Sequence, residues 1–135
     1  MTVSLDELIV EYREALVDGI VKDAIRQIRA YARAPLRQTV ERVERLLDAL
    51  AESIARNDPD VLERYLVGVA RERQQEGYAI MELHAIVHIS EEHVQAVIRD
   101  AVPDEVERNG LLALLGAVMG AARMVLSVRY ILGTR

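Results

Sequence analysis

Apolar residues recur every three or four positions along almost the whole chain, the spacing that places side chains on one face of an α-helix. The first such face extends over residues 5–32 and comprises Leu5, Leu8, Ile9, Tyr12, Leu16, Ile20, Ala24, Ile28 and Tyr31. Ser4 and Glu7 have the spacing of a capping box, in which each side chain accepts a hydrogen bond from the other residue's backbone amide. We therefore predict one helix that starts at Leu5, with Gly19 as a weak point midway.

Proline and glycine divide the rest of the chain. Pro35 suits the first turn of a second helix, Asp58 and Pro59 are typical of the N-cap and first position of a third, and Gly77 is typical of a left-handed helix end. A fourth helix is expected from Tyr78. The predicted breaks lie at Ala34–Pro35, Asn57–Pro59, Glu76–Tyr78 and Val102–Gly110.

The last helix is expected to begin at Leu111, because Asn109 and Gly110 form a turn signal after Pro103. It should extend to about Leu132. No segment shows the alternating pattern of a β-strand. We predict an all-α fold, a single domain over residues 1–135 made of about five helices. A plain antiparallel bundle is favoured, and a globin-like arrangement is the alternative.

The amino-acid composition limits the classes of function that the chain could have. Apolar residues make up 51% of the chain and charged residues 29%, which suits a compact core. Cysteine is absent, and the amino terminus lacks the basic and apolar segments of a secretory signal, so we expect a cytoplasmic protein. A net charge of −5 argues against nucleic-acid binding. One acid-free segment, residues 24–40, carries Arg26, Arg29, Arg33 and Arg37, and we interpret it as a solvated helix face rather than an anion site.

All three histidines fall in the fourth predicted helix. His84 and His88 are four residues apart, so both imidazoles could reach one ion, and Glu91 could add a carboxylate oxygen. The segment reads HAIVH, however, and lacks the glutamate of the zinc-hydrolase HExxH motif. His93 lies on a different face. We favour histidines hydrogen-bonded at a helix border, with no metal and no cofactor. A metal- or haem-binding protein, with or without enzymatic activity, built on His84, His88 and Glu91 is the alternative.

Other catalytic patterns are missing from the sequence. No serine has the context of a nucleophile elbow, and no glycine-rich loop is suited to phosphate. The acidic residues pair with arginines at helical spacing, as on a solvated surface. We therefore expect a protein that is not an enzyme.

The last predicted helix is apolar on nearly all sides. Its uncharged run, Leu111 to Ala122, has only twelve residues, fewer than the roughly 20 that a bilayer needs, so we expect no membrane span. Ala113, Gly116 and Gly120 form a stripe of small residues along which another backbone could approach. We predict a homodimer that pairs through this face. Burial of the helix at the centre of its own bundle is the competing explanation.

Two segments carry a resemblance to a known family. They read PLRQTVERVERLLDALAESIARND and VARERQQEGYAIMEL, and they resemble the N-terminal domain of stressosome co-antagonist proteins of the RsbR and RsbRD type. The resemblance spans about Pro35 to Val102. Family members are often arginine-rich after Leu83, where this chain has histidines instead. The residues that match the family pattern are Arg71, Arg73, Gly77, Tyr78, Glu82 and Leu83.

The resemblance implies a helical signal-input module, distantly globin-like in some members and without haem, that pairs and precedes output domains in regulators and kinases. We therefore expect a non-enzymatic regulatory or sensory domain of bacterial signal transduction. It would act through a signalling protein partner, an output domain or a small apolar ligand. The candidate pocket residues are Tyr65, Tyr78, His84 and His88, where aromatic and imidazole groups meet the apolar border. Whether the chain is free-standing or an input domain stays open.

Overall fold

A computed structural model describes residues 2–133 of the chain, with side chains as far as Arg129. Within that part the protein has seven helices and no strand, which confirms the all-α prediction and corrects the expected number of about five. The helices are α1 (Leu5–Glu11), α2 (Arg13–Gln27), α3 (Arg29–Arg33), α4 (Leu36–Ala55), α5 (Pro59–Gln75), α6 (Ile80–Ala101) and α7 (Glu105–Gly133).

The predicted helix over residues 5–32 is three helices. Tyr12 leaves helical geometry at φ −99° and ψ 13°, and Ile28 is extended at φ −121° and ψ 113°. Tyr12 still donates to the carbonyl of Leu8 over 3.0 Å and accepts from Leu16 over 2.9 Å, so the chain bends there with its hydrogen bonds intact. The bend lets α1 pack against α4 while α2 packs against both α4 and α6. The apolar spacing continues through the bend, so the sequence pattern does not show where the chain bends.

The predicted capping box at Ser4 is wrong. Ser4 makes no side-chain cap, and its buried hydroxyl has no hydrogen-bond partner in the described part of the chain. Glu82 performs a related role at the start of α6. One oxygen of its carboxylate accepts from the amide of Ala79 over 2.9 Å, and the other accepts from the amide of Ala30 in α3 over 3.2 Å. A single carboxylate therefore joins the first turns of two helices.

Two other predicted helix ends are confirmed. The Asp58 side chain accepts from the amide of Asp60 over 3.0 Å, and Pro59 is the first residue of α5. Gly77 has φ +89°, the left-handed geometry that favours glycine. The next helix begins at Ile80 instead of the predicted Tyr78.

The last helix starts earlier than predicted. It begins at Glu105 and includes Asn109 and Gly110, which were expected to form a turn. The Asp104 carboxylate accepts from the amide of Glu107 over 2.9 Å and so caps the helix. An N-cap contributes about 1 kcal/mol, similar to the cost of one glycine in a helix interior. The cap and the packing of the following turns outweigh the turn signal.

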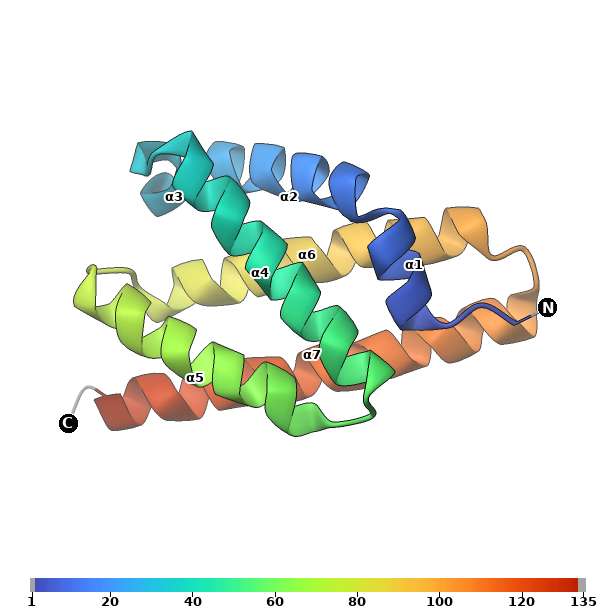
Figure 1. Ribbon diagram of the computed structural model, residues 1–135. Coiled ribbons are helices and arrows are strands. Elements are labelled where there is room, and N and C mark those ends of the chain that lie inside the picture. Colours follow the sequence, from blue (N-terminus) through green and yellow to red (C-terminus); the bar gives the residue numbers. More distant parts are fainter. Residues whose placement is uncertain (1, 134–135) are drawn as a thin grey trace.

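Figure 1 shows α6 and α7 as antiparallel neighbours joined by a short connection, with α5 beside α7, and α4 packed on α1, α2 and α5 and crossing the bundle at an oblique angle. This crossing differs from the plain antiparallel bundle favoured by the sequence. The N-terminal segment lies beside the start of α7, where the amide of Val3 donates to Glu107 over 2.7 Å. The largest fully buried side chains come from six helices and include Leu5, Ile20, Leu47, Leu66, Leu83, Ile98, Leu115, Met119 and Leu126.

Candidate functional site

The three histidines have three separate partners. His84 is half-buried, and its Nε2 lies 2.9 Å from the hydroxyl of Ser127 on α7. His88 is exposed, and its Nε2 lies 3.1 Å from a carboxylate oxygen of Glu92 on the same helix. His93 points toward α2 instead. A cluster that is compact in sequence is thus dispersed around α6.

Glu91 takes no part in a site with the histidines. Its side chain is buried and forms an ion pair with Arg123 of α7. The donors proposed for a metal therefore turn toward different neighbours. Across residues 2–133, no group of three or more His, Cys, Asp or Glu side chains is placed to hold a metal ion. The contacts of His84, His88 and Glu91 give no support to the metal- or haem-binding alternative.

His93 packs directly on the backbone of α2. A Cβ atom placed on Gly19 would lie 2.7 Å from Cε1 and 2.8 Å from Nδ1 of the imidazole. On its other side the ring places Nε2 2.6 Å from the carboxylate of Asp23. This contact is the first cause of a lowered pKa for Asp23, with burial opposing the shift. Gly19 therefore provides the space that lets the imidazole reach Asp23.

A small, partly open cavity is lined by residues of α3, α4, α5, α6 and α7. The volume of the cavity is about 30 Å³. Most of its wall is aliphatic, and its polar lining consists of two arginines and two tyrosines. The lining residues are Tyr31, Arg42, Val43, Leu46, Tyr65, Leu66, Val69, Arg73, Leu83, Ile86, Val87 and Leu126.

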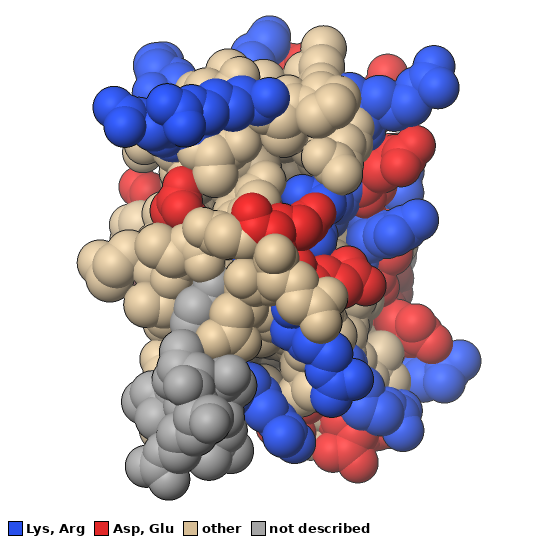
Figure 2. All heavy atoms as spheres, turned by 90° about the vertical axis from the view of Figure 1, so that its left-hand side faces the viewer, with Lys and Arg blue, Asp and Glu red and all other residues tan. Residues whose placement is uncertain are grey.

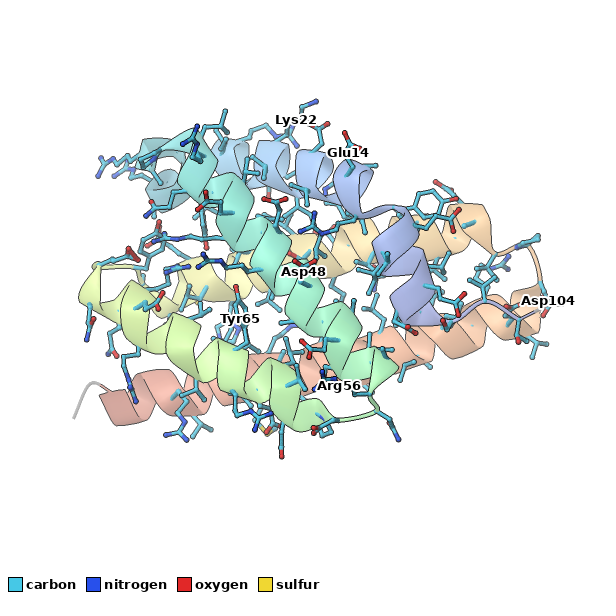
Figure 3. The ribbon with its side chains drawn as sticks, viewed as in Figure 1. Glu14, Lys22, Asp48, Arg56, Tyr65 and Asp104 are labelled. Atoms are coloured by element: carbon cyan, nitrogen blue, oxygen red, sulfur yellow. The ribbon has the colours of Figure 1, made fainter. Side chains whose placement is uncertain are left out.

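The cavity contains one of the four predicted pocket residues. Tyr65 lines it, and Figure 3 shows this side chain pointing from α5 toward α4, where its hydroxyl donates to the carbonyl of Arg42 over 3.4 Å. Tyr78 does not line it; its ring lies edge-on to that of Tyr31 at a centroid distance of 5.4 Å, and it lines a separate depression beside Arg29 and Arg33. His84 and His88 do not line this cavity.

A buried arginine, Arg73, and a half-buried one, Arg42, both line the cavity. Arg73 is only 4% exposed, and its Nη1 lies 3.2 Å from Glu76 and 3.3 Å from Glu72. Arg42 pairs with the same Glu76 over 2.7 Å. The Nε atom of Arg73 is buried and has no hydrogen-bond partner among the residues whose side chains are described. Sequence analysis named Arg73 only as a match to the family pattern and not as a pocket residue, because nothing in the polar run RERQQE indicates burial.

Tyr31 completes the polar side of the cavity. Burial raises the pKa of its phenol to about 12, and the positive charge and hydrogen bond of Arg73 oppose that rise. Arg42 supports the neighbouring ring, since its Nη1 donates to the Tyr78 hydroxyl over 3.2 Å and its Cζ lies 5.9 Å from that ring's centroid. The phenol and both guanidinium groups are therefore held in place by packing and ion pairs.

One side of α7 is buried and the opposite side is exposed. Leu115, Met119, Ala122 and Leu126 pack into the core. The predicted dimer residues Ala113, Gly116 and Gly120 all lie on the exposed side. We call this side the α7 face; its exposed residues are Ala113, Leu114, Gly116, Ala117, Gly120, Ala121, Met124 and Val128.

The α7 face is long and apolar. Met124 is 68% exposed and Val128 is 49% exposed. The most apolar 18-residue stretch within Glu105–Arg129 has a mean hydropathy of 2.0, and the segment could cross a bilayer by length and composition, although a soluble protein can contain such a helix. The sequence-based count of twelve residues was shorter because it began at Leu111 and ended before Arg123. Only 22% of the most apolar window of this helix is buried within the chain.

A groove adjoins the α7 face where α7 passes the turn between α4 and α5. It has a volume of about 270 Å³ and is lined by Ser53, Ile54, Asn57, Asp58, Pro59, Leu62, Glu63, Leu114, Val118, Ala121 and Ala122. Leu114 and Ala121 belong to both the groove and the α7 face. The exposed apolar surface is thus wider than one helix.

The arginine-rich segment of residues 24–40 is solvated. Arg26, Arg29, Arg33 and Arg37 are all exposed, as expected from the sequence. Figure 2 shows basic side chains gathered along the upper edge of the molecule, with acidic side chains below them across the middle. The exposed arginines are therefore distinct from the half-buried Arg42 and the buried Arg73.

Comparison of the chain with protein-family models, with curated proteins and with solved structures gives no match in any of the three. The resemblance to the stressosome input domain stays a prediction from the sequence, and the function is argued below from the residues themselves.

Proposed function

We propose that the chain is a non-enzymatic regulatory or sensory domain of bacterial signal transduction that works in the cytoplasm as a homodimer paired through the α7 face. The observation that carries the proposal is the exposed apolar side of a helix whose other side forms part of the core. Apolar patches that are large and contiguous usually mark interaction sites in soluble proteins. We assign a second copy of the chain as the partner that covers the α7 face.

The glycines of α7 support close pairing. Gly110, Gly116 and Gly120 lie in the helix, where each costs about 1 kcal/mol relative to alanine. A Cβ atom added at any of them would meet nothing within 4 Å. Packing inside one chain therefore gives no reason for glycine at these positions. Close approach of a second backbone would explain the glycines, and a two-fold axis would bring the same small residues of both copies together.

Polar contacts link α7 to the interior and suit a regulatory role. Glu91 of α6 forms an ion pair with Arg123 of α7, and His84 of α6 contacts Ser127 of α7. Leu126 of α7 lines the cavity. Because α7 is a single helix, a change in the interior that moves its buried side also moves the α7 face. Small shifts of a helix at a subunit interface are a common way to pass a signal to a partner protein or output domain.

Light scattering and a helix-face variant test the pairing. We expect wild-type protein at micromolar concentration to have twice the chain mass of 15.2 kDa, and Gly120→Leu to have the single mass with its helical circular dichroism retained. Gly68→Leu is the matched control, because Gly68 lies in α5 and a Cβ atom added there also meets nothing within 4 Å. A monomeric wild type, or equal dissociation of both variants, would contradict the proposal. Solubility only in detergent would assign the face to a membrane.

The absence of cysteine permits a direct test of the geometry. In a two-fold crossing, Ala117→Cys places one thiol beside its own copy, and mild oxidation should give a covalent dimer when the two Cα atoms are about 4.4–6.8 Å apart. Ala32→Cys is the control, since Ala32 is exposed on α3, away from the α7 face. Equal cross-linking of the two variants would indicate random collision and would refute the assigned face.

A further inference from the structure

We propose that the cavity between α3, α4, α5, α6 and α7 binds a small carboxylate, of one to three carbons, whose oxygens face Arg73 and Tyr31 and whose carbon end faces the aliphatic wall. The site names a ligand class for the proposed sensory function. It rests on that function for its biological use, while the binding itself can be measured independently of pairing.

The first argument is the unsatisfied donor of Arg73. A buried donor on a charged group that lacks an acceptor is strongly disfavoured, and native structures rarely leave one. The Nε–H of Arg73 is such a donor, and Arg73 lines the cavity. An acceptor atom within the cavity would satisfy it. Guanidinium groups are also well suited to carboxylates, because their planar N–H donors match the two carboxylate oxygens.

The second argument is the local charge. Arg42 and Arg73 both line the cavity, and both pair with Glu76. The Glu76 side chain is 39% exposed, and that of Glu72, the other partner of Arg73, is 69% exposed. These carboxylates are more exposed than the side chains of Arg42 and Arg73, which are 15% and 5% exposed, so we infer a positive potential in the cavity. Such a potential favours an anion over a neutral molecule of the same size.

The third argument concerns the size and the wall. A cavity of about 30 Å³ is small, so it excludes aromatic acids and long chains. Apart from the arginines and tyrosines, the wall consists of aliphatic side chains such as Leu46, Leu66 and Leu83. Phosphate and sulfate would place polar oxygens against these side chains. A small carboxylate has one polar end and one apolar end, which suits a lining that is partly polar and partly aliphatic.

The tyrosines add selectivity at the polar end. Tyr31 is 4% exposed and lines the cavity beside Arg73, so its hydroxyl can donate to a carboxylate oxygen. The Tyr65 hydroxyl is already used by the carbonyl of Arg42. Tyr31 is therefore the residue whose hydroxyl we assign to the ligand, together with the Nε–H of Arg73.

Nuclear magnetic resonance of the whole chain tests the site. Isotope-labelled protein is titrated with formate, acetate, propionate, hexanoate or chloride at constant ionic strength. We expect acetate and propionate to shift the Arg73 Nε–H signal in a saturable way, with hexanoate and chloride producing at most a weak shift. Arg73→Gln should weaken acetate binding by about tenfold or more, as expected for loss of a hydrogen bond from a charged group.

Two further variants make the result decisive. Tyr31→Phe preserves the shape of the wall, so it keeps the test valid if Arg73→Gln does not fold, and it should weaken acetate binding several-fold. Arg37→Gln is the control, because Arg37 is exposed and does not line the cavity. Absence of a saturable shift, an equal response to chloride, or equal weakening by Arg37→Gln would overturn the proposal. These outcomes are independent of the mass measured for the dimer.

Discussion

Replacing Gly19 by alanine should destabilise the protein, although the same change usually stabilises a helix. In a helix interior, alanine is favoured over glycine by about 1 kcal/mol. At Gly19, however, the new methyl group would lie 2.7 Å from Cε1 of His93, well inside van der Waals contact. The imidazole has to move away from α2, and its 2.6 Å contact with Asp23 is then lost or lengthened.

The magnitude follows from opposing terms. Overpacking costs about 1–3 kcal/mol, and loss of a hydrogen bond to a charged group costs about 1.5–3 kcal/mol when buried. The side chains of His93 and Asp23 are 28% and 25% exposed, so the lower end of each range applies. After the helix-propensity gain is subtracted, we expect a net loss of about 1–2 kcal/mol. For a chain of this size, 1 kcal/mol corresponds to about 3–4 °C in melting temperature.

Urea unfolding followed by circular dichroism measures this loss. Gly68→Ala is the control, because the same substitution in α5 meets nothing within 4 Å and should be neutral or stabilising. The double variant Gly19→Ala, His93→Ala should be more stable than His93→Ala alone, since the truncated residue leaves room for the methyl group. If Gly19→Ala stabilises the protein as much as Gly68→Ala does, the packing argument is refuted.

Two further predictions concern buried polar groups. Arg123→Leu should lower the free energy of unfolding by about 2–3 kcal/mol, because it leaves the buried Glu91 carboxylate without its partner, and adding Glu91→Leu should restore most of the loss in urea unfolding. Tyr31 has a pKa raised to about 12 from 10.0, so its contribution to stability is fully present below about pH 10 and is lost as the pH rises toward 12. Tyr31→Phe should therefore lose less stability than wild type between these pH values; an identical loss would contradict the burial of the phenol.

The helical faces could be predicted from the sequence because they depend on local spacing. Asp58, Pro59 and Gly77 act within one turn of their own helix ends, and the structure places them as expected. The bends at Tyr12 and Ile28 could not be predicted in this way, because each helix keeps the same apolar spacing on both sides of the bend. Their positions are set by packing against α4 and α6, which residue spacing does not record.

The candidate site was harder to predict, because its residues are distant in sequence. His84 and His93 are close in the chain, yet their partners lie 43 and 70 residues away on different helices. Arg73 stands among several charged residues in RERQQE. It is nevertheless buried, and it lines the cavity together with Tyr31 of α3 and Arg42 of α4. Its spacing gives no sign of burial, and charged residues are rarely buried without partners. A buried arginine on a polar segment can be recognised only once the neighbouring helices are placed.

The two proposals meet in α7, and thermodynamic linkage connects them. Leu126 lines the cavity from the buried side of α7, while Met124 and Val128, two residues away on either side, belong to the α7 face. A carboxylate that presses on Leu126 would therefore change the position of the surface that pairs. If acetate changes the dimer dissociation constant by some factor, pairing must change the affinity for acetate by the same factor, because coupling free energies are reciprocal. Titrating acetate against wild type and against monomeric Gly120→Leu measures this factor. Equal affinities would mean that the cavity and the α7 face act independently, whereas a difference would make α7 the element through which ligand binding is passed to a partner.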